Sequence, residues 1–183
     1  MNRLKNTRCY LSGAIEKATD GEGGASWRQK VKEDLKCFGI HWLDPTDKPI
    51  KEGKETPEMQ AKLKSDRQAG DIDAIKKVMV PICRIDLRLV DISDFLIVHL
   101  DPEVPTFGTH EEISRAASQN KPVLLMCEGG LKTAPLWWYE RLDPHLFFGS
   151  WDALYYYMDF ISNCASHSLA RDYKWLFFDW MGE

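Results

Sequence analysis

Short apolar runs alternate with amphipathic stretches along most of this 183-residue chain. The runs are bounded by polar residues or glycine, which is typical of strands that are buried on both faces of a sheet. We predict such strands at residues 8–12, 40–43, 95–100, 122–126 and 145–148. Because helical patterns separate them, the chain is expected to form a three-layer α/β fold, a parallel sheet with helices on both faces.

Stretches with apolar residues at helical spacing predict the intervening helices. They are expected at residues 26–38, 57–68, 72–92, 109–119 and 151–163. The first would begin with a capping box, Ser26-x-x-Gln29, and end before Gly39. The third contains Pro81, which predicts a break or a kink.

The length predicts a single domain, residues 1–183, that buries roughly 70% of its unfolded surface. Residues 44–70 form a charged excursion with three prolines, which is expected to be a solvated surface loop or, alternatively, an active-site lid. The C-terminal tail, residues 165–183, is strongly aromatic. Burial of this tail against a second copy would give a homo-oligomer, and packing on its own domain is the alternative.

The formal net charge of −4 argues against binding to nucleic acid, which needs a basic face. No apolar run approaches the ~18 residues of a membrane span, and the N-terminal residues lack the apolar segment of a signal peptide. The five cysteines lack any Cys-x-x-Cys pair, and the histidines show no metal-ligand spacing. We therefore expect a cytoplasmic protein without a metal site.

The strongest candidate for chemistry is Glu112. The apolar run 95–100 ends at Asp101, and Gly108 and Thr109 then open a predicted helix with Glu112 in its first turn. Ligands of open α/β sheets bind outside the carboxyl ends of strands, where a carboxylate can serve as nucleophile or general base. The helix dipole would keep it ionised there. Alternatively, Thr109-x-x-Glu112 is only a capping box.

Asp86 is the second candidate. The apolar face of its predicted helix consists of Ile82, Ile85, Leu89 and Ile92. At 100° per residue, Asp86 lies about 40° from Ile82, inside that face. Such a carboxylate lines a cavity or finds a partner. A buried salt bridge with Arg84 or Arg88, or an exposed helix edge, is the structural alternative.

The first predicted strand supplies a third candidate, with Tyr10 near its end and Gly13 after it. A strand that runs through glycine into a glycine-rich loop resembles a phosphate or ribose cradle. The loop glycines fit neither Gly-x-Gly-x-x-Gly nor a P-loop; they are Gly21, Gly23 and Gly24. Acidic side chains also disfavour a phosphate in this loop; they are Glu16, Asp20 and Glu22.

Four motifs in order across residues 8–126 carry a family resemblance. They are Tyr10-Leu-Ser-Gly13, Ile85-Asp-Leu-x-x-Val-x-x-Ser-Asp94, Gly108-Thr-x-x-Glu112-Ile-x-x-Ala116 and Lys121-Pro-Val-Leu-Leu-Met126. With them the chain resembles the nucleoside 2-deoxyribosyltransferase-like family. The resemblance implies a flavodoxin-like fold and a double displacement at the anomeric carbon of a nucleoside, without a cofactor.

In the mechanism that the resemblance implies, Glu112 attacks C1′ and displaces the base, and a second nucleobase then takes the sugar. Asp86 would hold the base or transfer a proton, and Tyr10 would orient Glu112. Two carboxylates flanking a glycosidic bond suit such cleavage. The expected substrate-binding residues are Ser12, Gly13, Asp101, Thr106, Gly108, Thr109 and His110, although His110 could instead be a solvent-facing cap residue.

Departures from the family pattern affect the substrate. Thr106 stands where the family often has an aspartate that contacts the sugar, and Ser114 stands in place of a common glycine. Related 5′-monophosphate hydrolases have Ser and Arg where this chain has Ala14 and Glu16, which favours a nucleoside. An N-glycoside hydrolase of nucleosides or nucleotides, and a non-catalytic nucleotide-binding module, remain alternative interpretations.

Overall fold

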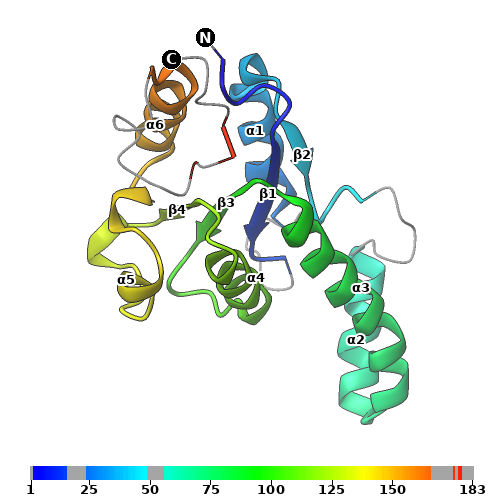
Figure 1. Ribbon diagram of the computed structural model, residues 1–183. Helices are drawn as coiled ribbons and strands as arrows, with labels where there is room; N and C mark the ends of the chain where they lie inside the picture. Colours follow the sequence, from blue (N-terminus) through cyan, green and yellow to red (C-terminus); the bar gives the residue numbers. More distant parts are fainter. Residues whose placement is uncertain (1, 16–23, 49–55, 166–174, 176, 179–183) are drawn as a thin grey trace.

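The protein is built around one parallel sheet (Figure 1). The computed structural model describes residues 2–15, 24–48, 56–165, 175 and 177–178. The strands of the described part are β1 (Arg8–Gly13), β2 (His41–Leu43), β3 (Phe95–Leu100), β4 (Val123–Cys127) and β5 (Phe147–Phe148). Their order is β2-β1-β3-β4-β5, and all neighbours are parallel. This doubly wound order is that of flavodoxin-like folds, so the predicted fold class is confirmed.

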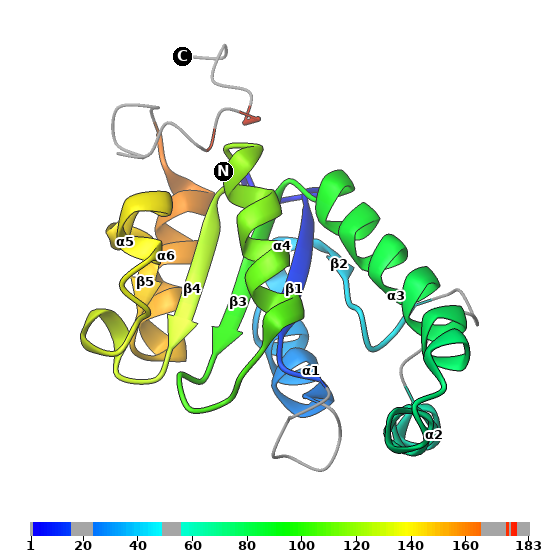
Figure 2. The same ribbon diagram turned by 90° about the horizontal axis from the view of Figure 1, so that it is seen from below.

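Helices cover both faces of the sheet (Figure 2). The α-helices of the described part are α1 (Ala25–Asp34), α2 (Pro57–Ala69), α3 (Ile72–Ile92), α4 (Phe107–Ser118), α5 (Trp138–Arg141) and α6 (Trp151–Asn163). Leu11 of β1 faces the core that α1 and α6 cover, whereas the neighbouring Tyr10 faces the core that α3, α4 and α5 cover. Consecutive residues of a strand point to opposite faces, which explains the two cores.

The carboxyl end of β1 is held close to its neighbours by Gly13. A Cβ atom at Gly13 would lie 2.9 Å from the Trp27 ring and 3.0 Å from the carbonyl oxygen of His99. A larger residue here would require the Trp27 ring or the backbone of β3 to move. Gly24, the residue before α1, has φ of 75°, a left-handed conformation that glycine adopts readily.

Several predicted element ends are wrong in detail. Helix α1 begins at Ala25 after Gly24, so the capping box at Ser26 is not formed, and Gln29 donates a hydrogen bond to Glu33 instead. Helix α3 continues through Pro81 without a break. Strand β5 is confined to Phe147–Phe148, because residues 144–146 form a 3₁₀ turn.

The excursion is not simply a solvated loop. Helix α2 begins where it was expected within the excursion and ends one residue later, and it packs beside α3 (Figure 1). Lys48, at the other end of the excursion, is buried. Residues 49–55 of the excursion and residues 16–23 of the glycine-rich loop lie outside the described residues.

The described part of the aromatic tail packs on its own domain. Trp175 and Phe178 are buried in the core under α6, and the Trp175 indole donates a hydrogen bond to the hydroxyl of Tyr157 at 2.9 Å. The prediction that a partner subunit buries these aromatic residues is therefore wrong for Trp175 and Phe178. The homo-oligomer itself stays a prediction.

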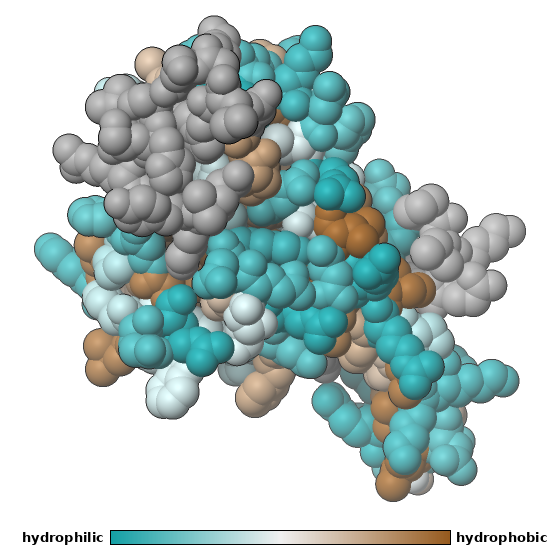
Figure 3. Space-filling view, viewed as in Figure 1, coloured by the Kyte–Doolittle hydropathy of each residue, from teal (hydrophilic) through white to brown (hydrophobic). Residues whose placement is uncertain are grey.

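The surface shown in Figure 3 is mainly hydrophilic, with separate apolar areas. In the part of the chain that the structure describes, no helix combines the length and apolarity needed to cross a membrane. The same residues contain no group of three or more His, Cys, Asp or Glu side chains placed to hold a metal ion.

Candidate active site

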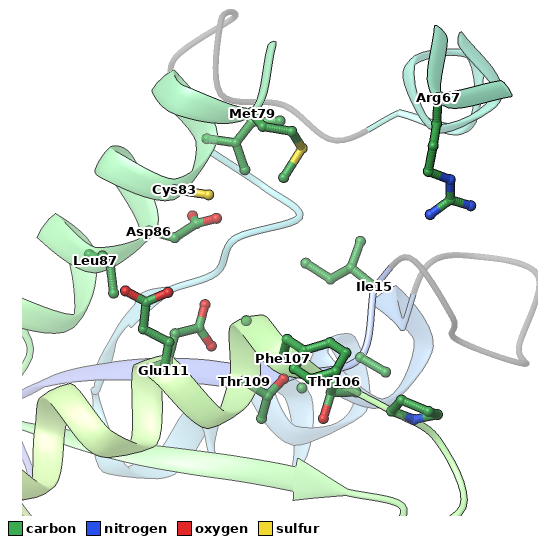
Figure 4. A pocket seen from close by; sticks show the side chains of 16 residues that line it. Ile15, Arg67, Met79, Cys83, Asp86, Leu87, Thr106, Phe107, Thr109 and Glu111 are labelled. Atoms are coloured by element: carbon green, nitrogen blue, oxygen red, sulfur yellow. The ribbon is translucent and has the colours of Figure 1, made fainter. Parts of the chain in front are cut away.

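A pocket of about 300 Å³ opens at the carboxyl edge of the sheet, between β1, α3 and the start of α4 (Figure 4). Ligand pockets usually have volumes of this order or larger. Its polar walls include Asp86, Thr106, Thr109, Glu111 and Glu112. Its apolar walls include Ile15, Met79, Ile82, Cys83, Leu87 and Phe107. The two carboxylates predicted from the sequence thus line one cavity.

The carboxylate of Glu112 is bound by two hydroxyl groups of β1. The Tyr10 hydroxyl donates to Oε1 at 2.7 Å, and the Ser12 hydroxyl donates to Oε2. Tyr10 and Ser12 are both fully buried. Each carboxylate oxygen retains a further lone pair, so Glu112 is fixed in position while it can still face a ligand.

Helix α4 begins earlier than predicted, at Phe107 with Thr106 as N-cap. Glu112 therefore lies in the second turn, and the expected first-turn position is wrong. Its carboxylate contacts β1, so the capping-box interpretation is wrong as well. The sequence placed Glu112 at the correct edge of the sheet but for the wrong local reason.

Burial raises the pKa of Glu112 to about 7. The nearby Asp86 raises it further, whereas the hydrogen bonds from Ser12 and Tyr10 and the charge of Arg28 lower it. The expectation that a helix dipole keeps the carboxylate ionised is therefore wrong, because desolvation outweighs the stabilising contacts. Near neutral pH the side chain populates both its neutral and its charged form.

Asp86 lies on the buried face of α3 with Ile82 and Val90, as the periodicity predicted. Its partner is Lys48, with Nζ 2.6 Å from Oδ1, rather than Arg84 or another residue of its own helix. Burial raises the pKa of Asp86, and the Lys48 ammonium opposes that shift. The residue both forms a buried ion pair and lines the pocket, so the two interpretations hold together.

Arg28 of α1 was not identified from the sequence. Its guanidinium is buried and donates hydrogen bonds to the backbone carbonyls of Leu11, Gly13 and Gly24. It also lies 3.8 Å from Asp44. Arg28 thereby stabilises the carboxyl end of β1 through these hydrogen bonds. It also places a positive charge near the carboxylates of Asp86 and Glu112.

The other predicted substrate-binding residues separate into two groups. Gly13, Thr106, Gly108 and Thr109 line the pocket. Asp101 and His110 are not among the lining residues. Asp101 accepts a hydrogen bond from the backbone of Glu103, and the His110 ring stacks on Trp138 with centroids 5.5 Å apart.

The lining residues that were not predicted as site residues include Arg67 and Phe107. Arg67 comes from α2 of the excursion, and its guanidinium is the cationic group among the lining residues of this pocket. Phe107 stands at the rim and is 85% exposed. No sequence pattern pointed to Arg67, because its position depends on how α2 packs on α3.

Comparisons with known proteins agree with this arrangement at the level of the fold. No protein-family model matches the chain, and the curated proteins give no match. Among solved structures, a 2-desoxiribosyltransferase from Leishmania mexicana is 18% identical with a TM-score of 0.52, and the match covers 86% of this chain and 99% of that one. The chain thus shares the fold of that transferase, which confirms the predicted resemblance in fold.

Two further structures match less closely. A 2-deoxyribosyltransferase from Bacillus psychrosaccharolyticus is 15% identical, with a TM-score of 0.49 over 74% of this chain and 82% of that one. A conserved protein from Enterococcus faecalis V583 is 20% identical, with a TM-score of 0.40 over 66% of this chain and 63% of that one.

Proposed function

We propose that this protein cleaves the N-glycosidic bond of a nucleoside and transfers the (deoxy)ribosyl group to another base. The observation that carries the proposal is the carboxylate of Glu112, held by Tyr10 and Ser12 and facing a pocket that also contains Asp86. A fixed carboxylate beside a second acid is the arrangement that glycoside cleavage through a covalent intermediate requires. The fold shared with a 2-desoxiribosyltransferase supports the same assignment.

In the proposed reaction the ionised Glu112 attacks C1′ of the sugar. A C1′–O bond to Glu112 forms as the C1′–N bond breaks, and the base leaves with the bonding electrons and takes a proton from solvent. A nitrogen of a second base then attacks C1′, loses its N–H proton to solvent, and releases the Glu112 carboxylate as the C1′–O bond breaks. Tyr10 and Ser12 orient the nucleophile, and Asp86 contacts the base.

Removal of the nucleophile tests the proposal. Glu112→Ala and Glu112→Gln should lower base exchange by about 10³-fold or more, because no other step can form the glycosyl intermediate. The measurement is product analysis after incubation with a panel of nucleosides, their 5′-monophosphates and free bases. Glu111→Gln is the matched control, because Glu111 lines the same pocket without a contact to Tyr10 or Ser12. Exchange at the parental rate in Glu112→Ala would refute the assignment.

Hydrolysis on the same scaffold is the second candidate. Phe107 at the rim is 85% exposed, so solvent reaches this edge of the pocket, and water would compete with a base for the intermediate. Free sugar without a new nucleoside, in excess base, would identify a hydrolase. Stabilisation by nucleosides without any turnover would instead indicate a binding module.

The same panel of substrates tests whether the enzyme acts on a nucleoside or on a nucleoside 5′-monophosphate. Arg67 in the pocket wall favours an anionic substituent on the substrate. The side chain of Ala14, also in the wall, offers no hydrogen bond to a phosphate, which favours a nucleoside. If the protein prefers the 5′-monophosphate, and Arg67→Gln loses that preference, the substrate is a nucleotide.

A further inference from the structure

A buried ion pair stands directly behind the pocket wall. Lys48, from the segment after β2, has its Nζ 2.6 Å from Oδ1 of Asp86. The Lys48 side chain is fully buried, and Asp86 is 6% exposed. Asp86 lines the pocket, whereas Lys48 does not. Lys48 can therefore influence a bound ligand through the carboxylate of Asp86.

Burial of both charges is costly, and a buried pair of this kind often contributes little to stability. The more direct consequence of the ion pair concerns the protonation state of Asp86. Burial disfavours the carboxylate, and the adjacent ammonium favours it. Among the residues that the structure describes, the other charged or titratable groups that act on this region are Tyr10 of β1, Arg28 of α1 and Glu112 of α4. Among these, Lys48 is the group in direct contact with Asp86.

We propose that Lys48 is a positioning residue that holds Asp86 as a charged hydrogen-bond acceptor, so that the pocket selects bases presenting an N–H group to it. This inference rests on the proposed function, in which Asp86 contacts the base. A carboxylate only accepts hydrogen bonds, whereas a neutral carboxylic acid also donates one. A base with an exocyclic amino group donates to the carboxylate, and a base without that group offers it no donor at this position.

Adenine and unsubstituted purine differ only in the 6-amino group and serve as probes. Isothermal titration calorimetry with each free base should show roughly tenfold or more tighter binding of adenine to the unmodified protein, because a hydrogen bond to a charged group is made or lost. In Lys48→Met, Asp86 becomes neutral and the preference should fall to about twofold or less. Lys48→Arg retains the charge and should retain most of the preference.

Lys32→Met is the matched control for loss of an ion pair in this region. Lys32 Nζ lies 2.6 Å from Asp44, away from the pocket lining, so this variant should keep the preference for adenine. A parental preference in Lys48→Met, with only a lower melting temperature, would mean that Lys48 is purely structural and would overturn the proposal.

Loss of one partner of a buried pair can prevent folding. The double variant Lys48→Met/Asp86→Asn removes both charges and places an amide, which both donates and accepts, at the pocket wall. It should also lose the preference, and retention of the parental preference there would overturn the proposal. Equal binding of both bases by an unmodified protein that exchanges bases would refute this inference alone. Failure to bind either base, without turnover, would refute it together with the proposed function.

Discussion

The two hydroxyl groups that bind Glu112 are two residues apart on β1. Alternate residues of a strand point to the same face, so Tyr10 and Ser12 approach the α4 side of the sheet together. Their separation lets each hydroxyl bind a different oxygen of one carboxylate. A single residue of α4 is thereby held by a rigid strand rather than by its own helix.

The ionisation of Glu112 determines how activity is expected to depend on pH. Its pKa is raised to about 7, and only the ionised form is a nucleophile. We predict that kcat/KM for base exchange rises with pH up to about 7 and then levels off. Tyr10→Phe and Ser12→Ala each remove a donor to the carboxylate, which should raise the pKa and move this limb upward by roughly one pH unit.

Stability offers an independent measurement of the same pKa. The folded value of about 7 lies above the ordinary 4.5, so between these values the folded state binds more protons than the unfolded state. The free energy of unfolding should therefore decrease as pH rises through this window. In Glu112→Ala that contribution should disappear from urea titrations.

The kinetic prediction has its own contrary outcome. If the pH at which kcat/KM levels off is unchanged in both Tyr10→Phe and Ser12→Ala, the assigned contacts to Glu112 are contradicted.

At the scale of elements, the start of α4 determines the shape of the pocket. Thr106 is the N-cap without a side-chain capping bond, and Phe107, Gly108 and Thr109 form the first turn at the pocket wall. A Cβ atom added at Gly108 would meet no atom within 4 Å. Its conformation is not one that requires glycine, so the missing side chain leaves space in the pocket rather than relieving the backbone.

Gly108→Ala should therefore separate stability from activity. Alanine is favoured over glycine in a helix, so the free energy of unfolding should rise by about 0.5 kcal/mol. The added methyl group would occupy pocket space, and KM for the nucleoside should increase several-fold. The measurements are urea unfolding and steady-state kinetics, with Ala117→Gly, at the far end of α4, as a control that weakens the helix without touching the pocket lining. Unchanged KM would show that the substrate does not approach Gly108.

The periodic elements were the easier part of the structure to predict. Strands β1, β3 and β4 have apolar runs that are buried from both sides, so their positions follow from local sequence. Helix ends were less accurate, since Ser26 and Thr109 are suitable capping residues that the tertiary contacts place inside helices. Capping patterns describe local preference, and the packing of Glu112 on β1 overrides it.

For the whole molecule, the predictable part of the site was limited to residues within motifs. Glu112 and Asp86 were predicted because each stands in a pattern with a local signal. Lys48, Arg28 and Arg67 belong to segments whose positions depend on long-range packing, and a charged residue in a polar stretch gives no sign of burial. The same limit applies to the aromatic tail, whose composition predicted burial but not which surface buries it.

The packing of the tail gives the last prediction. Trp175 is fully buried, its ring lies 5.3 Å from that of Phe95, and its indole donates to Tyr157. Trp175→Ala should lower the free energy of unfolding by about 3–5 kcal/mol, the usual cost of removing a buried aromatic side chain. Phe177→Ala, at a position that is 40% exposed, should cost much less. Because these contacts lie within one chain, the loss measured by urea unfolding should be the same across a hundredfold range of protein concentration. A loss that grows on dilution would instead mean that a second copy covers this surface.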